Sequence, residues 1–242
     1  MGQDLSSSAD LKDAPVAFSK SGITRALTAA VILIHVLNVP AVLFQYVWPW
    51  EWAKHYIEFF SVSGEGKLST FYSGVTMLVA AALLLFISMR DPARGAFRVH
   101  WAALGVIFTL MAMDEMVQIH ELSTRITREF FGITSGPLYH AWVIPAMVFL
   151  AFMALAYGRF LWKLPRRSSV LFVVAGVVYV GGALVMEMVD SAYLAAYGHD
   201  LGYGVLATLE EVGEMVGMVI FIYALLDHLE RLSPDSRIRI VA

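Results

Sequence analysis

The chain has 242 residues, of which 59% are apolar and only 15% are charged, whereas soluble domains carry about 25% charged residues. The net charge of −3 is too small to indicate nucleic-acid binding, and the lack of cysteine excludes disulfides, cysteine-ligated zinc, iron–sulfur clusters and thiol catalysis. A mean hydropathy of +0.68 indicates a membrane protein.

Six apolar segments approach or exceed the roughly 20 residues that a helix needs to cross a bilayer. The sequence therefore predicts an all-α fold, a polytopic membrane helix bundle with six transmembrane helices. We expect a disordered cytoplasmic tail at 1–22, a transmembrane domain at 23–230 and a cytoplasmic tail at 231–242. The six segments are residues 23–48, 69–89, 98–119, 138–160, 169–190 and 203–227.

Lysine and arginine set the expected orientation of these segments. If the N-terminus is cytoplasmic, 13 basic residues lie on the cytoplasmic side and four on the outer side. This bias follows the positive-inside rule and predicts that both termini are cytoplasmic. The four outer residues are Lys54, Lys67, Arg125 and Arg128.

The loops and the last segment carry further structural patterns. The first outer loop is aromatic, and residues 51–60 are expected to lie along the membrane interface as a short helix. The second outer loop has an apolar stripe that includes Leu122 and Ile126, which predicts a second interfacial helix. Gly213 and Gly217 form a small-xxx-small pair that favours close helix approach.

Carboxylates and histidines gather toward the outer leaflet, on four of the six segments. Ionisable residues inside a membrane are costly and are functional-site candidates by default. No basic residue of the third, fifth or sixth segment lies at the same depth. The residues are Asp114, Glu115, His120 and Glu121 on the third segment, His140 on the fourth, Glu187 and Asp190 on the fifth, and Glu210, Glu211 and Glu214 on the sixth.

Helical phase, at about 100° per residue, indicates how the third segment presents these groups. Asp114, Gln118 and Glu121 share one face, and Glu115 lies about 100° away from it. On a regular helix His120 would point toward a different face. His140, beside an interfacial tyrosine and tryptophan, is interpreted as an interfacial anchor.

A divalent metal ion is the expected cofactor, because unneutralised carboxylates would repel one another or bind protons. Oxygen ligands with histidine suit zinc, iron or manganese without distinguishing among them. Carboxylates that stay protonated, forming a proton-handling site, are the alternative. The expected metal ligands are Asp114, Glu115, Glu211 and Glu214, with His120, Glu121 and Glu210 as further candidates, and the expected catalytic acid–base groups are His120 and Glu187.

Three short motifs together resemble an uncharacterised group of bacterial multi-pass membrane proteins. They are Gly64-Glu65-Gly66 before the second segment, Asp114-Glu115-x4-His120-Glu121 at the end of the third, and Glu210-Glu211-x2-Glu214 in the sixth. The resemblance covers most of the chain from about residue 50 onward. It implies a multi-pass protein of the bacterial inner (plasma) membrane and marks these residues, but it supplies no reaction.

The leading functional hypothesis is a membrane enzyme with a metal-dependent site that acts on a lipid or isoprenoid substrate. The first alternative is a transporter for a divalent cation or for protons. The second is a non-catalytic subunit or assembly factor of a membrane complex. Membrane lipids are the expected partners, and a homo-oligomer or a membrane-complex partner remains open.

Overall fold

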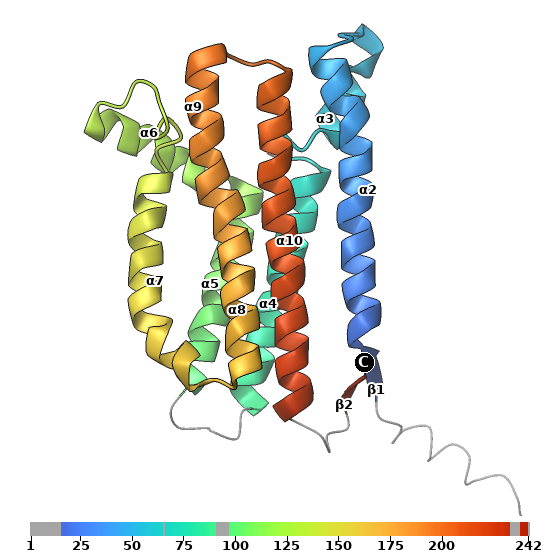
Figure 1. The fold of residues 1–242 in the computed structure, drawn as a ribbon, viewed down its shortest axis with the longest axis vertical. Helices are drawn as coiled ribbons and strands as arrows, with labels where there is room; N and C mark the ends of the chain where they lie inside the picture. Colours follow the sequence, from blue (N-terminus) through green and yellow to red (C-terminus); the bar gives the residue numbers. More distant parts are fainter. Residues whose placement is uncertain (1–15, 65, 91–96, 233–237, 242) are drawn as a thin grey trace, which may run out of the picture.

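The protein is described by a computed structural model that covers residues 16–64, 66–90, 97–232 and 238–241, and this part of the chain is mainly helical (Figure 1). The elements, in chain order, are β1 (Val16–Ser19), α2 (Lys20–Tyr46), η1 (Glu51–Ala53), α3 (Lys54–Phe60), α4 (Leu68–Arg90), α5 (Arg98–Val117), α6 (Ile119–Phe131), α7 (Val143–Lys163), α8 (Arg166–Val180), the π-helical turn η2 (Gly181–Met186), α9 (Glu187–Tyr197), α10 (Leu201–Leu232) and β2 (Ile238–Val241).

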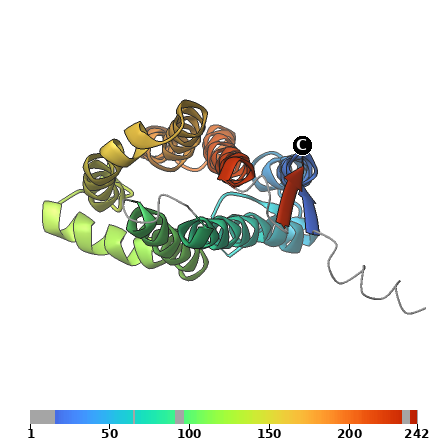
Figure 2. The ribbon, with the colours of Figure 1, turned by 90° about the horizontal axis from the view of Figure 1, so that it is seen from below.

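The long helices run side by side along one axis (Figure 1). Seen along that axis, α4 and α5 form one row, while α8, α10 and α2 form a second row (Figure 2). α10 is central to the packing, because it contacts α8, η2, α2 and α4. α7 lies at one end of the two rows, next to α8 and η2, and its Phe160 also packs on Trp101 of α5.

Five helices are long and apolar enough to cross a membrane, and the protein is a membrane protein with a helical bundle. Apolar side chains point away from the bundle, among them Leu155 at 86% and Trp162 at 88% exposure on α7. Such exposure is expected only where lipid surrounds the helix. The five helices are α2, α4, α5, α7 and the continuous run from Arg166 to Tyr197, which joins α8, η2 and α9.

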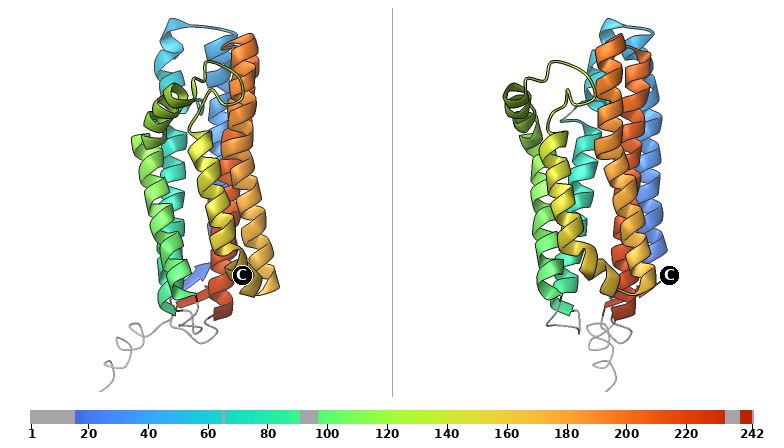
Figure 3. Two further views of the ribbon diagram at one scale, coloured as in Figure 1. Left: turned by 90° about the vertical axis from the view of Figure 1, so that its left-hand side faces the viewer. Right: turned by 60° about the vertical axis from the view of Figure 1, so that its left-hand side comes forward.

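The third predicted segment does not stay regular to its end, because α5 stops at Val117. Gln118 adopts the left-handed conformation, with φ 63° and ψ 42°, and its N–H donates to the Asp114 carbonyl at 2.7 Å. This conformation is uncommon for residues other than glycine and breaks the helix. α6 therefore leaves the line of α5 and lies across the bundle axis (Figures 1 and 3). Leu122 and Ile126 are exposed on it, as expected for the second interfacial helix.

α8 and α10 approach each other closely at two glycines. A Cβ atom on Gly182 would lie 2.7 Å from the Glu214 amide nitrogen, and one on Gly213 would lie 2.9 Å from the Gly182 Cα. Real Cβ atoms do not come so close to backbone, so only glycine fits. Gly182 belongs to η2, whose π-helical turn offsets α9 from the regular phase of α8. The contact sets the distance between the acidic residues of α9 and those of α10.

The two ends of the described chain meet at the strand end of the bundle, the end that carries β1 and β2 (Figure 1). The two strands pair in parallel, with Val16 opposite Ile238 and Ser19 opposite Val241. Residues 16–19 and 238–241 therefore form paired strands, although they lie within the segments 1–22 and 231–242 expected to be tails. Residues 1–15 and 233–237 lie outside the described part of the chain.

Beside these strands, Asp227 joins three elements through ion pairs. Its carboxylate is buried and lies 2.8 Å from Lys20 of α2, 3.2 Å from Arg167 of α8 and 3.1 Å from Arg231 of α10. Lys20 also pairs with Glu230 at 2.7 Å. A buried ion pair is costly to break, because removing one partner leaves an uncompensated charge.

Replacing Asp227 with asparagine should lower the free energy of unfolding by about 3 kcal/mol, the lower end of the range for a broken buried pair, because Glu230 still pairs with Lys20. Thermal unfolding in mild detergent measures this effect. Glu58→Gln is the control, because Glu58 and its partner His55 are 72% and 95% exposed, and it should cost less than about 0.5 kcal/mol. Equal losses in both variants would contradict the assigned role of Asp227.

Replacing Gly182 with alanine should force α8 and α10 apart and destabilise the protein by about 1–3 kcal/mol. Gly181→Ala is a matched control one residue away, because a Cβ atom there meets nothing within 4 Å. Thermal unfolding of the two variants in the same detergent checks the expectation. If Gly182→Ala is as stable as Gly181→Ala, the glycine contact does not limit the approach of the helices.

Candidate functional site

A cavity of about 730 Å³ lies between α5, α7, α8 and α10. All but one of the site residues predicted from the sequence line its polar part. Glu121 is the exception: it lies on α6, is exposed and does not line the cavity. The predicted residues that line it are Asp114, Glu115, His120, Glu187, Glu210, Glu211 and Glu214.

The rest of the cavity wall is apolar and aromatic and continues toward the strand end. Trp101 and Phe160, each 1% exposed, belong to this part of the wall together with Phe172 and Phe221. On α5 the lining extends from Trp101 to Asp114, which is about 20 Å at the helical rise per residue. The cavity is therefore amphipathic along its length, with its ionisable groups gathered at one end.

His120 and Asp114 form a hydrogen-bonded pair at the polar end. The His120 backbone N–H donates to Asp114 Oδ1 at 2.8 Å, and His120 Nδ1 lies 3.1 Å from Asp114 Oδ2. The Trp142 ring lies beside the imidazole, with 5.3 Å between centroids. The expectation that His120 points away from Asp114 and that Glu121 shares its face is wrong, because the chain turns at Gln118.

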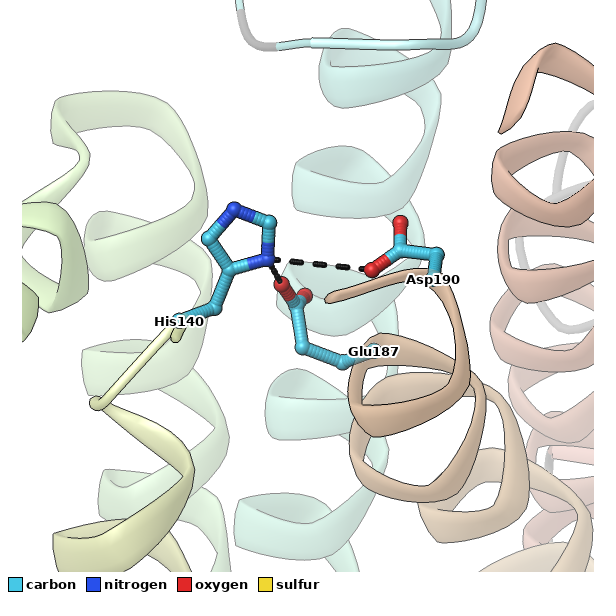
Figure 4. A group of neighbouring side chains, drawn as sticks. All are labelled: His140, Glu187 and Asp190. Carbon is cyan, nitrogen blue, oxygen red and sulfur yellow. Dashed lines mark ion pairs between the residues drawn. The ribbon is translucent and has the colours of Figure 1, made fainter. Parts of the chain in front are cut away.

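His140, Glu187 and Asp190 form a second group, in which each offers a ligand atom within 4.8 Å of the others (Figure 4). His140 Nδ1 is in direct ion-pair contact with Glu187 Oε1 and lies 3.7 Å from Asp190 Oδ1. Ser191 Oγ lies 2.9 Å from the same nitrogen. His140 therefore contributes to the site, and its interpretation as an interfacial anchor is wrong.

The charge of His140 follows from these neighbours. Burial favours the neutral imidazole, but the nearby carboxylates of Asp190 and Glu187 favour the charged form more strongly and raise the pKa of His140 to about 10. A positive charge is thus strongly favoured between the two carboxylates. Either an imidazolium proton or a metal ion bound to a neutral imidazole supplies it.

Two carboxylates of this group, Asp190 and Glu187, lie in surroundings that favour a bound cation or proton. Asp190 is only 3% exposed, and its Oδ1 has no hydrogen-bond partner. Glu210 of α10 lies close enough to Glu187 for their negative charges to repel each other. A proton or a cation between the two carboxylates would remove this repulsion.

The remaining carboxylates gather around Tyr179 of α8. Glu214, Glu115 and Glu211 all lie within electrostatic range of its hydroxyl. Lys67, from the turn before α4, interacts with Glu211, while its partial burial lowers the pKa of its ammonium group. A basic residue thus reaches the acidic groups from a loop, although none does so from the third, fifth or sixth predicted segment.

Sequence reasoning missed the roles of His140, Lys67 and Tyr179. His140 and Lys67 lie in loops, where helical phase gives no direction, and Tyr179 lies two residues before the phase change at η2. The positive-φ glycines Gly64 and Gly66, just before Lys67, indicate a tight turn. Glu65, which belongs to the same motif, lies outside the described residues.

Comparison with known proteins gives a family but no reaction. No curated protein and no solved structure matches the chain. A family model described as a domain of unknown function (DUF8692) matches residues 24–229. That range contains every residue of the cavity and of both ionisable groups. Because the match covers most of its length, the chain belongs to the DUF8692 family.

Proposed function

We propose that the protein is a metal-dependent enzyme of the bacterial inner membrane that acts on a lipid or isoprenoid substrate at the level of the outer leaflet. The observation that carries this proposal is the amphipathic cavity, which joins carboxylates and histidine at one end to an apolar aromatic wall at the other. Ligand sites are commonly apolar pockets with a few convergent polar groups. A chain-bearing molecule with a polar reacting group matches this division.

The dimensions of the cavity support a membrane lipid as the substrate. Its 730 Å³ lies within the range of small-molecule sites. Its wall along α5, about 20 Å long, is comparable to one leaflet of the bilayer core, which is about 15 Å thick. Between α5 and α7, Tyr157 and Phe160 of α7 pack on His100 and Trp101 near the strand end. The apolar part of the wall is thus closed there by aromatic side chains, which can surround a lipid chain.

The proposed orientation places the site end at the outer leaflet and the strand end in the cytoplasm. α10 is the sixth span in this arrangement, although three glutamates interrupt its apolar sequence. Basic residues at the strand end, such as Arg98, Lys163 and Arg231, agree with the positive-inside rule. Both termini are then cytoplasmic, as the sequence predicts.

The chemistry of the site supports acid–base catalysis beside a Lewis acid. A bound divalent ion would supply polarisation of a substrate oxygen or an acidified water. Asp114 holds the His120 ring through Nδ1, and His120 lines the cavity, so its imidazole is placed to act as a general acid–base group toward a bound substrate. Apolar walls keep bulk water from the substrate chain, and this strengthens the electrostatic interactions at the polar end.

Transport has less support from the described residues. A path for ions would have to pass the apolar half of the cavity, where Trp101 and Phe160 are almost completely buried. Charged species are strongly disfavoured in such surroundings. The turnover experiment below distinguishes an enzyme from a non-catalytic subunit.

The proposed topology predicts the sides from which single cysteines are labelled, and the chain has no native cysteine to interfere. Ser135→Cys, in the exposed loop before α7, should react with an impermeant maleimide in spheroplasts. Lys163→Cys, exposed at the end of α7, should react only in inside-out vesicles. Ser168 is fully buried and is unsuitable for labelling. Labelling of both positions from one side would contradict the orientation.

The proposed activity predicts turnover that depends on an open cavity. Gly176 lines the cavity, and a Cβ atom there meets nothing within 4 Å, so the side chain of Gly176→Phe should start without a backbone clash and occupy part of the cavity. Wild-type protein, incubated with total bacterial lipid extract and divalent metal, should convert one lipid class. Gly176→Phe should reduce that rate at least about 100-fold, because a misplaced substrate loses most of its positioning. Mass spectrometry of the lipids measures both.

Gly158→Phe is the matched control for this experiment. Gly158 also has open space around a Cβ atom, but it lies on α7 outside the cavity lining. Its variant should keep the wild-type rate. No metal-dependent change in any lipid class with folded wild-type protein would refute the enzyme and favour a subunit role. Equal rates in the two phenylalanine variants would show that the cavity does not hold the substrate.

A further inference from the structure

We propose that His140, Glu187 and Asp190, with Glu210 as a fourth ligand, bind one divalent transition-metal ion. This centre is different from the set of Asp114, Glu115, Glu211 and Glu214 that the sequence predicts. This proposal adds a metal site to the proposed function. Only the catalytic role of the ion rests on that function, because metal binding can be measured without turnover.

The spacing of the ligand atoms fits a single ion. The three ligand atoms lie within 4.8 Å of one another (Figure 4). Around a tetrahedral zinc ion with bonds of about 2.1 Å, neighbouring ligand atoms are about 3.4 Å apart. The 3.7 Å between His140 Nδ1 and Asp190 Oδ1 is close to that value. A metal ion bound to these atoms would take the place of the His140–Glu187 ion pair.

Asp190 gives a second, independent indication of a ligand. Its residue is 97% buried, and its Oδ1, which faces His140, has no hydrogen-bond partner. A buried unpaired oxygen costs about 1–3 kcal/mol, and more if it is charged. Purely structural residues seldom carry such a cost. A metal bond to this oxygen would remove it.

Glu210 completes the ligand set from the neighbouring helix. Its charge interacts with those of Glu187 and Asp190, and a Cβ atom on Gly182 would lie 2.8 Å from the Glu210 carbonyl oxygen, so η2 and α10 are in contact at this level. Carboxylates so close to each other require either a shared proton or a cation. One ion bound to His140, Glu187, Asp190 and Glu210 neutralises the group with ligands from a loop and two helices.

The donor set indicates the class of metal. An imidazole nitrogen disfavours calcium and magnesium, which prefer oxygen ligands. The chain has no cysteine, so the thiolates that favour copper(I) are lacking. One nitrogen with carboxylate oxygens is typical of zinc, manganese or iron(II) sites. The inferred ion is therefore one of these three, held beside the mouth of the cavity that Glu187 and Glu210 line.

The experiment is a metal titration of the whole chain in mild detergent. The protein is stripped with a chelator and dialysed against Zn²⁺, Mn²⁺ or Fe²⁺ separately, and bound metal is measured by elemental analysis. Wild type should bind one ion per chain. His140→Ala and Asp190→Asn should each weaken binding at least about 100-fold. Asp190→Asn keeps the shape of the side chain, so this variant should still fold. Gel filtration and thermal unfolding verify that it does.

Asp114→Asn and His120→Ala are the controls, because they alter the other ionisable group on the same cavity. Both should bind metal like the wild type. If these controls lose the metal while Asp190→Asn keeps it, the proposed ligand set is wrong. The proposal is also overturned if folded wild-type protein binds none of the three ions. One bound ion that depends on His140, without lipid turnover, would support this centre and refute the enzymatic role.

Discussion

The structure depends on the electrostatic cost of holding many carboxylates inside a membrane. Seven of them, from α5, α9 and α10, lie at one end of the bundle beside a largely apolar cavity. Each carboxylate that remains charged there requires a partner, because lipid and apolar side chains offer no solvation. Imidazoles, a lysine from a loop and a proposed metal ion supply that compensation. The residues that neutralise the group are therefore also the ones that the proposed chemistry would use.

The backbone departs from a regular helix at two places, Gln118 and the π-helical turn η2, which contains Gly182. Gln118 turns the chain through a left-handed conformation and brings His120 onto Asp114. The π-helical turn η2 resets the phase of α9, and such turns often mark functional sites. Gly182 lets this region touch α10. Together these departures from regular helix bring side chains from separate helices to one end of the cavity. The strand end, by contrast, holds its helices with the Asp227 ion pairs.

Sequence reasoning could locate the helices and most of the ionisable residues, because both follow from composition along the chain. The predicted segment 98–119 corresponds to α5, and Glu187, Glu210 and Glu214 line the cavity together. It could not orient His120, because a left-handed Gln118 leaves no trace in helical periodicity. It also undervalued His140, because the path of a loop over a bundle depends on tertiary contacts. Helical periodicity predicts the direction of a side chain only as far as the helix stays regular.

The central claim is that a divalent ion sits between α9, α10 and the loop before α7. Anomalous diffraction from crystals of the metal-loaded protein, collected on both sides of the absorption edge of the added metal, tests it most directly. The account predicts one peak about 2.0–2.2 Å from His140 Nδ1 and from an oxygen of Glu187. A peak between Asp114 and Glu214, or none at full metal loading, would contradict it.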